Sequence, residues 1–166
     1  MTTLVKKYSK LHSYLDAESK LTADEKQKEF EHLVGLFLKT DPYYGPTVYD
    51  PNTNNVPSTF IKRNNIGHLL AGQKSKGADW YTECGGGTAV EVKYQHDDSS
   101  IKLGKLSPKE VALNKTNITH RVLATNLSRV SREIVEYLDN WTYIFGESHK
   151  PFSFFDCSTT KYSSDH

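Results

Sequence analysis

Apolar residues recur at helical spacing in two segments of the first 41 residues. Residues 1–20 are predicted to form an extra N-terminal amphipathic helix, because every third or fourth position is apolar and lysines take the other side. A second helix is predicted to begin at Thr22, with Glu25 in the capping-box position, and to end before Pro42. Within it, Glu31 lies at the edge of the apolar stripe, where a carboxylate requires a partner.

Two stretches with strand propensity flank a run of glycines in the middle of the chain. Residues 80–82 are aromatic or β-branched, residues 88–94 have strand propensity, and Gly85 to Gly87 lie between them. The pattern predicts a hairpin that closes at the glycines. Asp79 and the segment from Glu91 to Lys93 would then meet at its open end, with Glu91 and Lys93 on one face.

The segment between the second helix and the hairpin has the composition of a loop. Residues 42–63 are rich in Pro, Asn, Tyr and Gly, which predicts a loop with a short strand near residues 47–49. Residues 64–72 resemble a turn of helix or a short connector.

After the hairpin the pattern alternates between helix and strand. Ser107 as a cap and Pro108 at the first helical position predict a short helix that ends near Asn114. The later pattern predicts a strand at 120–125, a helix at 128–138, and two strand-length segments at 141–145 and 151–155. This order predicts an α/β fold with three layers, in which helices cover a central mixed sheet.

Composition narrows the function classes without choosing one. The chain has 166 residues, which suits one domain, and a formal charge of only +1, so any attraction to nucleic acid must be local. The pairs Lys62–Arg63 and Lys74–Lys76 are candidate nucleic-acid contacts. The two cysteines form neither a disulfide framework nor a zinc site, and the sequence contains no signal peptide or apolar run of membrane-spanning length. We therefore expect a cytoplasmic protein with no membrane partner.

The open end of the predicted hairpin carries the clearest chemistry. Two carboxylates, Asp79 and Glu91, at close range suit a hard divalent cation such as Mg²⁺ or Mn²⁺, which binds through oxygen. Lys93 beside them can orient a water molecule or stabilise charge that develops on a phosphorus atom. These residue types together indicate phosphodiester hydrolysis. The alternative without a function is that Glu91 and Lys93 lie on a solvated strand face and form an incidental ion pair.

These residues resemble the PD-(D/E)xK nuclease superfamily, and within it the Mrr-like branch. The resembling motif is Gly77-Ala78-Asp79, then Glu91-Val92-Lys93, followed by Gln95. Ala78 departs from the proline or larger aliphatic residue that the family places before the aspartate. Supporting likenesses are Phe30–Val34 in the second helix and the strand that ends in Ala124-Thr125-Asn126.

The resemblance implies a restriction endonuclease-like core and a Mg²⁺-dependent DNA endonuclease. It implies that Asp79, Glu91, the Val92 carbonyl and Glu31 hold the metal, Lys93 positions the attacking water, and Gln95 orients water or phosphate. Glu29 replaces Glu31 if the helix is rotated, and Glu31 could equally pair with a lysine or solvent. An inactive nucleic-acid-binding module of the same fold and an RNA endonuclease stay open as alternatives.

The resemblance also has implications for how the chain is organised. The chain is similar to the N-terminal nuclease domain of helicase-driven restriction enzymes, so we expect it to belong to a restriction system. We expect a nuclease domain at residues 21–157 and a flexible tail at residues 158–166 that links to further domains. A helicase or methyltransferase region of the same longer chain would then direct the nuclease to DNA.

Overall fold

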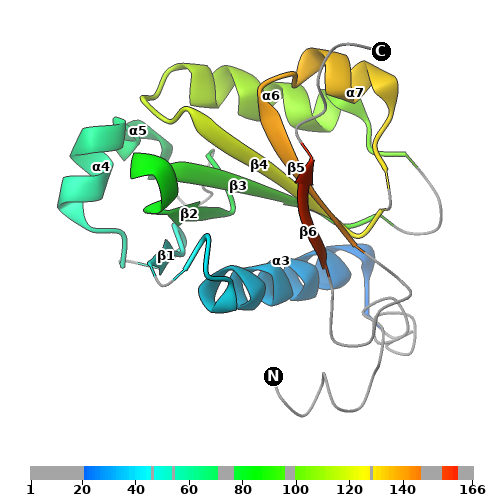
Figure 1. Cartoon of the computed structure of the whole chain (residues 1–166), viewed down its shortest axis with the longest axis horizontal. Coiled ribbons are helices and arrows are strands. Elements are labelled where there is room, and N and C mark those ends of the chain that lie inside the picture. Colours follow the sequence, from blue (N-terminus) through cyan, green and yellow to red (C-terminus); the bar gives the residue numbers. More distant parts are fainter. Residues whose placement is uncertain are drawn as a thin grey trace.

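The structure is a computed structural model that describes residues 21–45, 47–53, 55–70, 77–95, 100–127, 129–146 and 155–160. The helix predicted within residues 1–20 lies outside these ranges, as do Lys74 and Lys76. Element labels follow Figure 1, so the first described helix is α3.

A mixed sheet forms the centre of the described part of the chain (Figure 1). Its strands lie in sequence order, and the two inner pairs, β3–β4 and β4–β5, are parallel while the outer pairs are antiparallel. The strands are β1 (Val48–Tyr49), β2 (Trp80–Thr82), β3 (Thr88–Lys93), β4 (His120–Thr125), β5 (Trp141–Gly146) and β6 (Phe155–Thr160).

Helices cover both faces of this sheet, which makes the three layers of the predicted α/β fold (Figure 1). Helix α3 (Ala23–Thr40) packs on the face that carries Val90 and Val92. Helices α6 (Leu103–Asn114) and α7 (Arg132–Tyr137) pack on the opposite face, and α4 (Ser58–Asn64) and α5 (Gly67–Leu70) flank the hairpin. The predicted fold class is confirmed. No described helix has the length and apolar content needed to span a membrane.

Helix α3 has the ends that its sequence predicts. The Thr22 hydroxyl accepts a hydrogen bond from the backbone N–H of Glu25 at 3.2 Å, and the helix stops at Asp41, before Pro42. Its contact with the sheet depends on Gly35, which lies directly over the indole ring of Trp80. A Cβ atom at position 35 would lie 2.1 Å from Trp80 Cζ2.

Substituting Gly35 with alanine should destabilise the fold by about 1–3 kcal/mol, because α3 or Trp80 must move to make room for the methyl group. Urea unfolding followed by circular dichroism measures the change. Gly104→Ala is the matched control, because a Cβ there meets nothing within 4 Å and alanine favours a helix. Equal stability of Gly35→Ala and the wild type would contradict this packing.

The hairpin forms as predicted, with a longer turn. Strands β2 and β3 pair antiparallel, with Trp80 opposite Val90 and Thr82 opposite Thr88. The turn begins at Cys84 as a short 3₁₀ helix, and Gly85 and Gly86 adopt positive φ angles of 62° and 86°. Glycine tolerates this backbone conformation without strain, which explains the run of glycines.

Two predicted helix boundaries before and after the hairpin were wrong. Residues 58–63, predicted as loop, belong to α4, which ends at Asn64, because Phe60 is fully buried against Tyr49 and Tyr81 and stabilises the helix. Helix α6 begins at Leu103 rather than after Ser107, so Pro108 lies inside it. The earlier start brings Leu106 into the core, which the local capping signal did not reveal.

The C-terminal elements also differ from the prediction. The helix predicted at 128–138 is shorter, because Ser131 caps α7 through a hydrogen bond from Ile134 N–H. The segment predicted as a strand at 151–155 is described only at residue 155, where β6 begins. Strand β6 continues to Thr160, three residues past the predicted domain end at 157. Residues 161–166 lie outside the described ranges.

Candidate metal centre

The open end of the hairpin brings Asp79 against β3. The Asp79 N–H donates to the Val90 carbonyl at 3.0 Å and extends the ladder one residue beyond β2. Its carboxylate oxygen Oδ2 then accepts the N–H of Val92 at 2.8 Å. The Asp79 carboxylate therefore replaces a backbone partner for β3 just before β2 begins at Trp80. This hydrogen bond fixes the carboxylate beside Glu91.

Glu91 is the buried acid of the site, with 2% of its side chain exposed. Its oxygen Oε1 lies 3.3 Å from Lys93 Nζ on the same strand, and its oxygen Oε2 lies 3.8 Å from Lys109 Nζ on α6. Oε2 is buried and has no hydrogen-bond partner. A buried carboxylate oxygen that accepts no hydrogen bond is energetically costly, so this atom can still accept a closer cation than Lys109.

Helix α3 reaches the same end of the hairpin through Gln27 and Glu31. The Gln27 amide Nε2 donates to Glu31 Oε1 at 3.0 Å and to the Val92 carbonyl at 2.8 Å, and its Oε1 accepts the N–H of Tyr94 at 2.8 Å. The Trp80 indole N–H donates to the Glu31 backbone carbonyl at 2.9 Å. Gln27 thus joins the helix to β3 and orients the Glu31 carboxylate, which is partly buried.

Burial raises the pKa of each of the three carboxyl groups, and the charge of a neighbouring carboxylate adds to the rise for Asp79 and Glu31. Desolvation is the largest cause for Asp79, followed by the charge of Glu91, and its pKa rises to about 7. Burial also raises the pKa of Glu91, although the charges of Lys109 and Lys93 and the side-chain hydrogen bonds with Lys93 and Asp79 oppose the rise. Burial and then the charge of Asp79 raise the pKa of Glu31. Binding of a divalent cation at this site would therefore compete with protonation of these carboxyl groups.

Stability should fall as pH rises from about 4 to about 7, because Asp79 holds its proton in the folded state but loses it in the unfolded state over this range. The slope from one such group is at most about 1.4 kcal/mol per pH unit. Asp79→Asn removes this slope and keeps an oxygen for the Val92 N–H, so we expect it to be more stable than the wild type at pH 8.

Urea unfolding of both proteins at pH 5 and pH 8 tests this prediction. The exposed Asp139 provides the control Asp139→Asn, whose difference from the wild type should be small at both values. A stability difference between Asp79→Asn and the wild type that does not grow with pH would show that Asp79 is not held protonated by its surroundings.

The structure places Gln95 at the same edge through its backbone. The Gln95 N–H donates to Asn126 Oδ1 at 2.8 Å, and the Asn126 amide donates to the Gln95 carbonyl at 2.9 Å. Asn126 follows β4, so this pair joins the carboxyl ends of β3 and β4. The role predicted for the Gln95 side chain stays a prediction.

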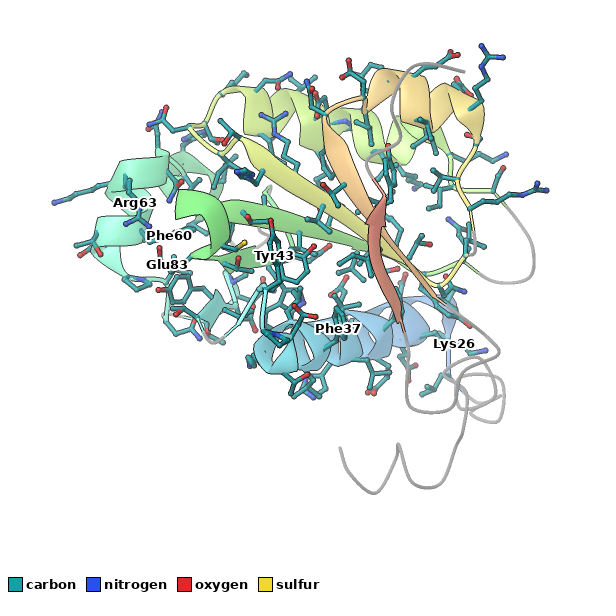
Figure 2. The ribbon with its side chains drawn as sticks, viewed as in Figure 1. Lys26, Phe37, Tyr43, Phe60, Arg63 and Glu83 are labelled. Atoms are coloured by element: carbon teal, nitrogen blue, oxygen red, sulfur yellow. The ribbon has the colours of Figure 1, made fainter. Side chains whose placement is uncertain are left out.

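Lys62 and Arg63 lie at the other end of the hairpin, on α4. Arg63 forms an ion pair with Glu83, donates from Nε to the Gly86 carbonyl at 3.2 Å, and packs over the Phe60 ring. Figure 2 shows Arg63, Phe60 and Glu83 together beside the turn. The structure therefore brings Asp79, Glu91, Lys93 and Glu31 together and separates the predicted basic pair from them.

Lys109 and Gln27 belong to the site but were missed as site residues. Lys109 follows the buried Leu106 by three positions and precedes the buried Leu113 by four, so it faces the sheet. Gln27 precedes Glu31 by one helical turn. In both cases helical spacing could have pointed to the residue, once the extent of the helix was known.

The donor set fits a hard divalent cation. Carboxylate and carbonyl oxygens are available from Asp79, Glu91, Glu31 and Val92, and the Val92 carbonyl has one lone pair left beside its bond from Gln27. Among the described residues, no group of three or more His, Cys, Asp or Glu side chains is clustered tightly enough to hold a metal ion alone. Mg²⁺ would therefore retain several water molecules, as it usually does in proteins.

Comparison of the chain with protein-family models, curated proteins and solved structures gave no match. The function of the site is therefore proposed from its geometry and from the resemblance of its sequence motif.

Proposed function

We propose that this chain is a metal-dependent DNA endonuclease with a restriction endonuclease-like core. The observation that carries the proposal is the buried Glu91 Oε2, which has no hydrogen-bond partner while Asp79 and two lysines surround its carboxylate. Two acids with raised pKa values beside a lysine favour a catalytic site over a structural ion pair, because carboxyl groups with perturbed pKa values gather at active sites.

Each side chain has a distinct role in this proposal. Asp79, Glu91, Glu31 and the Val92 carbonyl would hold Mg²⁺ or Mn²⁺, which would polarise a phosphoryl oxygen and lower the pKa of a bound water. Lys93 would hold the attacking water through its ammonium group, which lies 3.3 Å from Glu91 and is 23% exposed. Gln27 would keep Glu31 and β3 in register by its hydrogen bonds to both.

The reaction would be hydrolysis of a phosphodiester bond. The water oxygen would form a bond to phosphorus as the bond from phosphorus to the leaving deoxyribose oxygen breaks. The attacking water would give up one proton, and the leaving oxygen would take up one proton, so the step balances. We propose DNA as the substrate on the resemblance of the Asp79 and Glu91–Lys93 motif to DNA nucleases. A helicase or methyltransferase region of the same longer chain, which would bring the nuclease to its target in a restriction system, is part of the same proposal.

Conversion of supercoiled plasmid to nicked circles tests the proposal. The purified protein is incubated with plasmid and Mg²⁺, Mn²⁺ or EDTA, and a single-stranded RNA of similar length is assayed in parallel. We expect nicking of the plasmid with either metal and none with EDTA. Cleavage of RNA alone would identify an RNA endonuclease, and binding of plasmid without nicking would favour the inactive binding module.

A further inference from the structure

Lys109 is the one contributor to this site from the helical layer opposite α3 among the described residues. Its ammonium group donates to the Gly77 carbonyl at 2.7 Å and lies 3.8 Å from Glu91 Oε2, the oxygen without a hydrogen-bond partner. The side chain is 22% exposed, so the ammonium group lies where the site meets solvent. Lys109 therefore contacts the atom that a metal ion would bind.

Helix α6 is held on the sheet by polar and apolar contacts on either side of Lys109. The neighbouring Glu110 accepts a hydrogen bond from Arg121 at 3.0 Å and from the Trp141 indole at 2.6 Å, which ties α6 to β4 and β5. Leu106 and Leu113 bury the same helix against the sheet. A change in the partner of Lys109 would therefore need only a rotation of its side chain, which is 22% exposed.

A divalent cation would reverse the sign of the net charge that the ionised groups of the site carry. With all groups ionised, three carboxylates (Asp79, Glu91 and Glu31) face two ammonium groups (Lys93 and Lys109), which leaves one negative charge. A divalent cation reverses this to one positive charge. A site with that charge attracts a phosphodiester, and a lysine freed from a carboxylate can contact it as a point charge.

We propose that Lys109 is a second lysine of the active site, which neutralises Glu91 in the metal-free protein and contacts a DNA phosphate once a metal ion occupies that carboxylate. This inference rests on the proposed function. The inference makes DNA affinity at this site depend on the metal. The Lys109 ammonium group pairs with Glu91 before metal binding and with a DNA phosphate afterwards.

The experiment measures binding of a 30-base-pair DNA duplex by fluorescence anisotropy, in Ca²⁺, which we expect to fill the site without supporting cleavage, and separately in EDTA. For Lys109→Met we expect about tenfold weaker binding in Ca²⁺ and a salt slope lower by about one. In EDTA we expect no difference from the wild type. Lys109→Arg should keep most of the affinity in Ca²⁺, and Lys105→Met, at an exposed position of the same helix, should behave as the wild type.

Three results would overturn the inference. Equal losses for Lys109→Met in Ca²⁺ and EDTA would mean that Lys109 contacts DNA or supports the fold regardless of the metal. Unchanged affinity in Ca²⁺ would exclude the phosphate contact. Equal wild-type affinity in Ca²⁺ and EDTA would contradict the metal site itself, and with it the role of Lys109. Lys109→Gln, which keeps an amide donor, takes the place of the methionine variant if that variant does not fold.

Discussion

Substitution of Lys93 by methionine should slow metal-dependent nicking of plasmid DNA by about a thousandfold while the protein still binds Mn²⁺. The physical reason is that Lys93 donates a hydrogen bond to the attacking water in this proposal, and removal of one preorganised donor from an active site costs about 10²–10³ in rate. Methionine retains the length of the side chain, so packing beside Glu91 changes little. Single-turnover nicking rates and Mn²⁺ calorimetry measure the two properties separately.

Lys105→Met is the matched control for this prediction. It removes the same charge and adds the same side chain at an exposed position of α6, so its nicking rate should equal that of the wild type. Circular dichroism confirms that each variant is folded. Nicking by Lys93→Met at the wild-type rate would contradict the role assigned to Lys93 and would return the Glu91–Lys93 pair to an incidental ion pair.

Substitution of Glu91 by glutamine should abolish nicking through a different step, the loss of metal binding. Glutamine has nearly the same shape but carries no charge, and Glu91 Oε2 is the oxygen that the fold leaves without a partner. Substitution of groups that merely support a metal ligand costs about 10–100-fold in affinity, so the loss of a ligand should cost at least about 100-fold. Calorimetry with Mn²⁺ measures the affinity directly.

Glu83→Gln is the control, because Glu83 lies at the closed end of the hairpin and pairs with Arg63. Its Mn²⁺ affinity should be unchanged. If Glu91→Gln binds Mn²⁺ as tightly as the wild type, the metal ion is held elsewhere and Glu91 is a structural residue. The two substitutions, at Glu91 and Lys93, thus separate binding of the metal from the use of its chemistry.

The residues of the site that could be predicted are those whose positions depend on local structure. Asp79, Glu91 and Lys93 lie on one hairpin, and strand alternation with a glycine turn is enough to bring them together. Glu31 required one further step, the helical period of α3, which places it at the edge of the apolar stripe. Local periodicity therefore predicted the acidic part of the site.

Lys109 and Gln27 depend on contacts between distant segments, which a single sequence does not specify. Lys109 reaches Glu91 only because α6 packs over the sheet. The Ser107–Pro108 pair predicted a helix that starts after Ser107, so the first turn of α6 was not included in the predicted helix. The position of Gln27 on α3 carries no signal in the sequence. Its hydrogen bonds to Val92 and Tyr94 form because β2 begins only at Trp80 and does not pair with this part of the chain. The boundary errors at α4 and α6 have the same cause, since burial of Phe60 and Leu106 outweighs local signals.

Paramagnetic line broadening by Mn²⁺ tests the central claim most directly. Amide spectra of the protein are recorded by nuclear magnetic resonance as substoichiometric Mn²⁺ is added. We predict that signals from residues near Asp79, Glu91 and Glu31 broaden first, while those beside the turn, at Glu83 and Gly86, persist. Broadening that is spread evenly over the surface, or that begins at the turn, would contradict a metal centre at the open end of the hairpin.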